Sequence, residues 1–248
     1  ERRLEKEFGL REVIIVGENS SEDGMKESLG EAAARYLEYT IKDGNIVGVS
    51  MGSTLFEVVS HVVHPAAQKV TFVPLVGGVG RVRMELHANS LAESLSRIYD
   101  GKFVPLHAPA RVSSRNIRDE LLKEDSLLPA IYLTQKLDIA VVGIGYPNEK
   151  SAIMATGYFK ENEIESLIDR KVAGELCMQF YDIYGDTAPY KDDNNVIGMD
   201  ISMLRSVPRS IGIAGGVEKL RAVRGAINGH YINTLITDIE CAEALISE

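Results

Sequence analysis

The sequence predicts an α/β protein of Rossmann-like architecture, in which helices cover both faces of a mostly parallel β-sheet. Short runs of β-branched and aliphatic residues alternate with longer segments of helical apolar spacing along the 248 residues. The runs are apolar without interruption, as in residues 139–142, the most hydrophobic strand candidate. Such runs are typical of strands buried on both faces, as parallel sheets require.

The alternation can be followed in order. A strand at 13–16 precedes a helix whose buried face carries Met25, Leu29, Ala32 and Tyr36 at three- and four-residue spacing. After a turn at residues 42–45, the same reasoning predicts strands at 46–50, 70–75, 103–106, 139–142, 211–214 and 232–236. It also predicts helices over 55–62 and 85–99, and one helix after each of the last two strands. No repeat or linker-like stretch divides the chain, so we expect one domain over residues 1–248.

Composition excludes several classes of protein. The 36 acidic and 27 basic residues give a net charge of −9, which argues against a cationic face for nucleic acid. No 18-residue apolar run and no signal peptide is present, so a soluble cytoplasmic protein is expected. Cys177 and Cys241 each lie in a stretch of helical spacing and are interpreted as buried small hydrophobes, with a disulfide as the alternative.

Two strand-to-helix loops could bind an anion. In the first, Gly52 lets backbone amides approach a phosphate, and Ser53 and Thr54 add hydroxyl donors; a plain turn with an N-cap is the alternative. In the second, Gly215 and Gly216 precede Lys219, which falls in the first helical turn, where the helix dipole disfavours a cation. A bound anion would relieve that conflict. Glu218 could do so instead, or Lys219 could be simply solvated.

Further candidates are weaker when taken singly. Gly77 and Gly78 precede Arg81 and Arg83, which share a face in extended backbone and could form a phosphate fork or be two surface arginines. Glu175 lies in a segment with helical spacing and could accept hydrogen bonds from sugar hydroxyls, or face solvent. The five histidines are scattered, and the dinucleotide fingerprint is absent after the first strand, so neither a metal nor a cofactor is expected.

The ordered set of segments is more specific than any one of them. The chain resembles the C-terminal effector-binding domain of SorC-type sugar-binding transcriptional regulators over nearly its whole length. The matching segments are residues 4–16, 48–54, 75–80, 87–89, 105–110, 138–145, 197–199, 214–219 and 231–238.

The resemblance implies a fold similar to sugar-phosphate isomerases and glucosamine-6-phosphate deaminases, with ligand binding kept and catalysis lost. By motif, Gly52, Ser53, Thr54 and Lys219 would hold the phosphate of a sugar effector. His87 and Glu175 occupy positions that resemble sugar-hydroxyl contacts. An N-terminal helix-turn-helix domain, absent from this chain, would contact operator DNA, and the regulator would be a homodimer or homotetramer.

One position departs from the family pattern. Some members carry a basic residue immediately before the paired glycines that correspond to Gly77 and Gly78, where this chain has Val76. Arg81 and Arg83 are the candidates to replace it.

Two rival functions remain open at this stage. An active sugar-phosphate isomerase or deaminase would need a carboxylate base, for which Glu175 or Asp182 could be proposed, although neither lies in a recognisable catalytic loop. A module that serves only in oligomerisation is the second rival. It would bind no ligand, so the glycine loops at 52, 77–78 and 215–216 and Lys219 would then occur together by coincidence.

Overall fold

A seven-stranded sheet organises the part of the chain that the computed structural model describes, namely residues 1–19, 21–63, 65–80, 83–148 and 156–247. Its strand order is β1-β9-β8-β5-β2-β3-β4, and every neighbouring pair is parallel. The strands are β1 (Glu12–Val16), β2 (Ile46–Val49), β3 (Thr71–Pro74), β4 (Lys102–Phe103), β5 (Ile139–Gly143), β8 (Arg209–Ile213) and β9 (Thr234–Asp238). The predicted parallel α/β architecture is confirmed.

The strand order reverses direction once, between β2 and β5. From β2 the chain adds β3 and β4 toward one edge, then returns to β5 and adds β8 and β9 toward the other. At such a reversal the connecting loops leave the sheet on opposite faces and open a crevice beyond the carboxyl ends of the two central strands. The fold therefore places a ligand-sized opening at the ends of β2 and β5.

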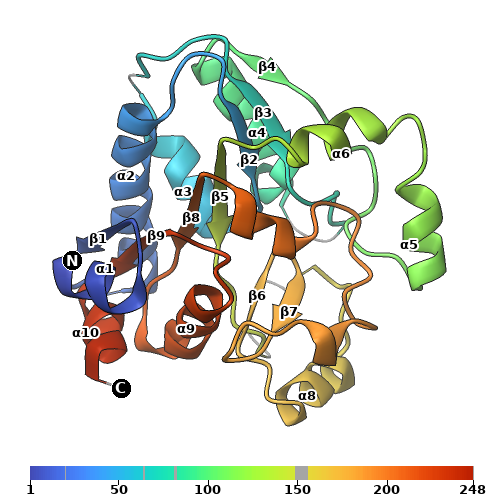
Figure 1. The fold of residues 1–248 in the computed structure, drawn as a ribbon. Helices are drawn as coiled ribbons and strands as arrows, with labels where there is room; N and C mark the ends of the chain where they lie inside the picture. Colours follow the sequence, from blue (N-terminus) through green and yellow to red (C-terminus); the bar gives the residue numbers. More distant parts are fainter. Residues whose placement is uncertain (20, 64, 81–82, 149–155, 248) are drawn as a thin grey trace.

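Helices cover both faces of the sheet (Figure 1). On one face, α2 (Glu22–Thr40), α3 (Ser53–His61) and α4 (Ala88–Ile98) bury the side chains of Ile139 and Val141 of β5. Ala140 and Val142 point to the opposite face and its separate core. That core is covered by α1 (Arg2–Phe8), α6 (Leu128–Thr134), α9 (Leu220–Asn228) and α10 (Ile239–Ser247). A short helix, α5 (Arg115–Leu121), lies beyond α6.

Two predicted elements are shorter than expected. The helix expected over 85–99 is divided into a 3₁₀ turn, η1 (Met84–Leu86), and α4, because His87 has extended backbone between them (φ −72°, ψ 143°). The strand expected over 103–106 pairs with β3 only through Lys102 and Phe103. None of the helices in the described ranges is long and apolar enough to span a membrane.

The segment around Glu175 forms a β-hairpin, so the helix suggested by its spacing is wrong. Strand β6 (Gly174–Leu176) pairs antiparallel with β7 (Gln179–Tyr181), and both turn residues, Cys177 and Met178, have positive φ (50° and 64°). Paired left-handed residues are typical of two-residue hairpin turns. Backbone hydrogen bonds between Glu175 and Gly145, of 2.9 and 3.0 Å, attach the hairpin to the loop after β5, and such tertiary pairing overrides local helical spacing.

The two cysteines differ from the sequence prediction in one respect. Both are buried free thiols, as expected. Cys241 lies in α10, whereas Cys177 lies at the hairpin turn and not in a helix.

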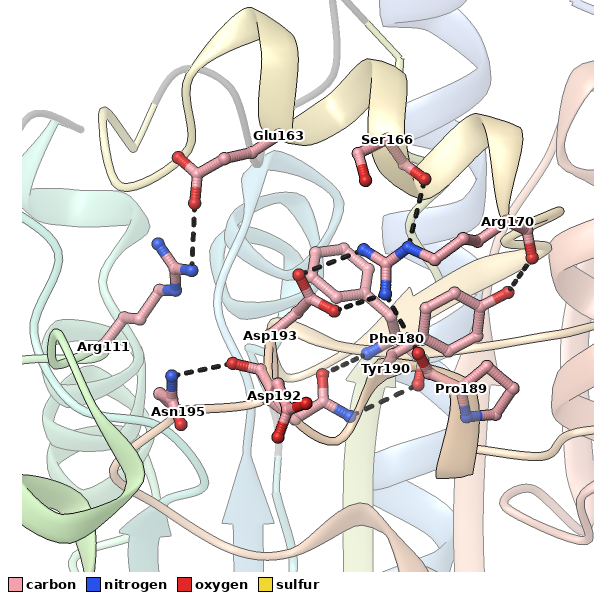
Figure 2. A network of polar contacts seen from close by, with 11 residues as sticks. Arg111, Glu163, Ser166, Arg170, Phe180, Pro189, Tyr190, Asp192, Asp193 and Asn195 are labelled. Atoms are coloured by element: carbon pink, nitrogen blue, oxygen red, sulfur yellow. Dashed lines mark hydrogen bonds and ion pairs between the residues drawn. The ribbon is translucent and has the colours of Figure 1, made fainter.

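Arginine–carboxylate pairs hold the helix α8 (Glu161–Asp169) at both of its ends (Figure 2). At its first turn, Nη2 of Arg111 lies 3.2 Å from a carboxylate oxygen of Glu163. Immediately after its last turn, Arg170 binds Asp193 through two contacts, of 2.8 and 3.1 Å. Arg170 also donates to the carbonyl of Pro189 at 2.9 Å. The helix is therefore fixed to the loop that follows the hairpin.

We expect Arg170→Met to lower the free energy of unfolding by about 1–2 kcal/mol, because a partly buried bidentate pair and a carbonyl contact are lost together. Urea denaturation monitored by circular dichroism measures the change. Arg97→Met is the matched control: it breaks a single pair with Glu93 on the exposed face of α4, expected to contribute less than about 0.5 kcal/mol. Equal losses in the two variants would contradict the structural role of Arg170.

Candidate functional site

A cleft of about 880 Å³ lies at the carboxyl ends of the central strands. Its walls come from the loops after β2, β5 and β8, together with the first two turns of α2. Glu175 of the hairpin and Ile168 of α8 complete the lining. Ile168 is 43% exposed although apolar, and the two arginine pairs that fix α8 also fix this wall. The cleft thus coincides with the reversal of strand order.

The loop after β2 presents the start of α3 to the cleft. Gly52 is the N-cap and has φ 123°, a conformation that favours glycine, and its amide donates to the carbonyl of Leu86 at 3.0 Å. No side chain caps α3, so Ser53 and Thr54 are the first helical residues and not caps. Both line the cleft. Their amides have no acceptor among the described residues, as is usual for the first turn of a helix.

The loop after β8 reaches the same cleft from the other side of β5. Gly215 lines the cleft, and a β-carbon there would lie 2.7 Å from the sulfur of Met25 in α2. Gly216, at φ 94°, donates its amide to Oδ1 of the buried Asp238 at 3.1 Å and does not line the cleft. Lys219 ends a single 3₁₀ turn, η4 (Val217–Lys219), just ahead of α9.

Lys219 is a partly buried cation facing several carboxylates. Burial lowers the pKa of its ammonium, while Glu175, Glu218 and Glu22 oppose that shift. No hydrogen bond or ion pair to the ammonium occurs among the described residues. The ammonium is thus partly buried near three carboxylates that it does not contact through a hydrogen bond or ion pair within the described ranges.

Glu175 extends along the hairpin side of the cleft. Its Oε2 accepts a hydrogen bond from the amide of Met178 at 2.9 Å. Its Oε1 lies over Gly145, where a β-carbon would approach it to 1.9 Å, so only glycine leaves room for this side chain. Burial raises the pKa of the carboxyl, against the opposing effects of the Met178 amide and of Lys219.

The remaining sequence candidates lie elsewhere or outside the described residues. The amides of Gly77 and Gly78 donate to the carbonyls of Ile197 and Ala108, at 2.9 and 2.8 Å, and neither residue lines the cleft. Arg83 is exposed and lies 3.4 Å from a carboxylate oxygen of Glu85. His87 is partly buried at the start of α4, also away from the lining. Arg81 falls outside the described residues.

Several residues of the cleft were missed by the sequence reasoning. The helical spacing of α2 predicts a core face only, yet Glu22 and Lys26 of this helix contribute to the lining and form an ion pair of 2.6 Å. Ser50 and Cys177 line a smaller recess beneath the cleft. In the described ranges no group of three or more histidine, cysteine or acidic side chains is placed to hold a metal ion.

Comparison with known proteins gives one consistent result. The family model described as a putative sugar-binding domain matches residues 1–247. A deoxyribonucleoside regulator of Bacillus subtilis is 27% identical over 248 residues, covering 99% of this chain and 78% of the relative. A sorbitol operon regulator of Klebsiella pneumoniae is 29% identical, covering 99% and 79%. The crystal structure of a probable sor operon regulator from Shigella flexneri superposes with a TM-score of 0.91 at 29% identity, covering 99% and 97%.

We expect Glu175→Gln to stabilise the ligand-free protein at about pH 7 and to lose that advantage toward about pH 4. Burial raises the folded-state pKa above the ordinary value of 4.5, so the folded protein binds this proton more tightly than the unfolded chain. The stability that the parent protein gains from the protonated Glu175 carboxyl is present below pH 4.5 and is lost as pH rises through the pKa of the folded state.

Thermal melting followed by circular dichroism across this pH range measures the difference. Glu165→Gln, on the exposed face of α8, is the control and should show no such trend. A Glu175→Gln variant less stable than the parent at neutral pH would show that Lys219 and the Met178 amide outweigh burial.

Proposed function

The chain belongs to the family of putative sugar-binding domains, and we propose that it senses a phosphorylated sugar for a bacterial transcriptional regulator. Relatives that match it along almost its whole length are named as regulators, among them the deoxyribonucleoside regulator and the sorbitol operon regulator. The ligand class proposed for this chain rests on the chemistry of the cleft.

The observation that carries the proposal is the convergence on one cleft of two glycine-containing loops whose residues suit an anion. β2 and β8 flank β5, so their ends are two strand spacings apart, about 10 Å. Ser53 and Thr54 offer hydroxyls and helix N-terminal amides from one side, and Lys219 offers an ammonium from the other. Amides at a helix start together with an unpaired cation suit a phosphate group.

The opposite wall suits the hydroxyl-bearing part of a sugar. Glu175 presents a carboxylate oxygen, and Tyr146 and Asn148 add further polar groups to the lining. Carboxylate and amide side chains accept hydrogen bonds from hydroxyl groups. We place the phosphate near Lys219 and Ser53, and the sugar toward Glu175.

The same residues favour binding without turnover over an isomerase or deaminase. Of the two acids considered as a base, Asp182 does not line the cleft, and its Oδ1 accepts the amides of Tyr184 and Asp186, both at 2.9 Å. Of the two acids, only Glu175 could then act as a base, and its Oε2 already accepts a hydrogen bond from the Met178 amide. The named relatives are likewise regulators.

Control of transcription would then require contacts outside this cleft. The net charge of −9 makes this domain a poor binder of DNA phosphates, so operator contact is assigned to a helix-turn-helix domain of the full-length protein. We propose that the regulator acts in the cytoplasm as a homodimer or homotetramer, since symmetric assemblies match repeated operator half-sites.

We expect Lys219→Ala to weaken binding of sugar phosphates roughly 10- to 150-fold, because a charge-assisted contact typically contributes about 1.5–3 kcal/mol. The corresponding unphosphorylated sugars should lose little, since they do not engage the ammonium. Isothermal titration with a panel of pentose, hexose and hexitol phosphates measures both. Lys191→Ala removes an exposed lysine away from the cleft and should change neither affinity.

Two outcomes would contradict the proposal in different ways. Equal losses for phosphorylated and unphosphorylated sugars would make Lys219 a structural residue. An unchanged affinity for the phosphates would place the phosphate elsewhere, with Arg83 and Arg81 as the next candidates.

A further inference from the structure

A small recess adjoins the cleft where the chain leaves β2. It has a volume of about 40 Å³ and shares Met51, Gly52, Gly143 and Glu175 with the cleft. Ser50, Thr156, Cys177 and Met178 form the rest of its wall. A space of this size holds about three water molecules, so one hydroxyl-bearing carbon of a ligand fits and a sugar ring does not.

Ser50 supplies a hydrogen-bond donor to the recess. Ser50 is 2% exposed, and its amide donates a hydrogen bond to the carbonyl of Val141 at 3.0 Å. Its Oγ accepts the thiol hydrogen of Cys177 across 3.5 Å. Burial raises the pKa of that thiol to about 12, so the sulfur keeps its hydrogen and donates. The hydroxyl hydrogen of Ser50 is therefore directed elsewhere, and no acceptor for it occurs among the described residues.

Glu175 supplies the matching acceptor. Its Oε2 is already used by the Met178 amide, whereas its Oε1 accepts no hydrogen bond within the described ranges. The residues that line the recess thus include one open donor, on Ser50, and one open acceptor, on Glu175. A hydroxyl group, which both donates and accepts, satisfies the two at once, whereas a carbonyl oxygen only accepts and a methyl group does neither.

We propose that this recess binds one hydroxyl group of the effector, with Ser50 donating to its oxygen and Oε1 of Glu175 accepting its hydrogen. The inference rests on the proposed function and deepens it: the effector is a sugar phosphate with a free hydroxyl on the carbon that enters the recess. Ser50 is a specificity-determining residue, and Cys177 is a positioning residue that acts through Ser50.

A sugar phosphate without that hydroxyl is rejected because it leaves the buried hydroxyl of Ser50 and the partly buried Oε1 of Glu175 without partners. Sites built to hydrogen-bond a substrate hydroxyl discriminate strongly against the deoxy analogue for this reason. The phosphate end is unaffected, since Ser53, Thr54 and Lys219 lie outside the recess.

The test uses isothermal titration with inorganic phosphate, with the panel of pentose, hexose and hexitol phosphates, and with singly deoxygenated analogues of the tightest-binding member. Ser50→Ala should weaken that member about 2- to 12-fold, as expected for one neutral hydrogen bond. It should leave inorganic phosphate and one of the deoxy analogues unchanged. Ser210→Ala is the matched control: this serine is equally buried, in β8, donates to the carbonyl of Tyr231 at 2.6 Å, and does not line the cleft.

Cys177 gives a second and independent variant. Cys177→Ala removes the donor that orients Ser50 and should weaken the same member less than Ser50→Ala does. Cys177→Ser retains a donor and should restore the affinity, which a purely structural role of the thiol would not predict.

The outcomes separate the two proposals. Binding of the panel with no effect of Ser50→Ala, or with equal losses for inorganic phosphate, overturns the recess and leaves the proposed function standing. Failure of inorganic phosphate and of every panel member to bind the unaltered chain contradicts the proposed function, and the recess assignment with it.

Discussion

Parallel pairing across the whole sheet is the constraint on which the rest of the structure depends. Because all strands point the same way, the loops after β2, β5 and β8 leave from one edge, although they are separated by up to about 160 residues of sequence. The reversal of strand order between β2 and β5 keeps that edge open there. Residues with no local relation, such as Ser53 and Lys219, therefore face one space without any dedicated contact between them.

The electrostatics of the cleft follow from this convergence. Glu22, Glu175 and Glu218 surround Lys219, and Lys26 is already paired with Glu22. These carboxylates oppose the lowering of the ammonium pKa by burial, and their negative charge disfavours anions that make no other contact in the cleft. Under the proposed function, a ligand that offers hydroxyls to the carboxylates and an anion to the lysine matches both walls of the cleft, which phosphate alone does not.

The sequence predicted the sheet and its covering helices because continuous apolar runs and helical spacing are local signals. Glycines mark the loops that carry Ser53, Thr54 and Lys219, and all three residues line the cleft. The sequence failed to predict the secondary structure around Glu175. The apolar residues there have helical spacing, but the segment is a hairpin that pairs with Gly145, about 30 residues upstream. Ser50 and Ile168 carried no local signal. The place of Ser50 in the recess depends on strand order, and the place of Ile168 in the cleft depends on the distant arginine pairs that fix α8.

The buried Asp238 connects the loop that carries Lys219 to helix α10. One of its oxygens, Oδ1, accepts both the amide of Gly216 in the loop before Lys219 and the amide of Cys241 in the first turn of α10, at 3.1 and 3.2 Å. Helix α10 in turn lies beside α1, whose Glu5 accepts the amide of Val13 on the edge strand β1. The Asp238 carboxylate thus links the loop that carries Lys219 to the first turn of α10, and through α10 to the helix α1 beside it.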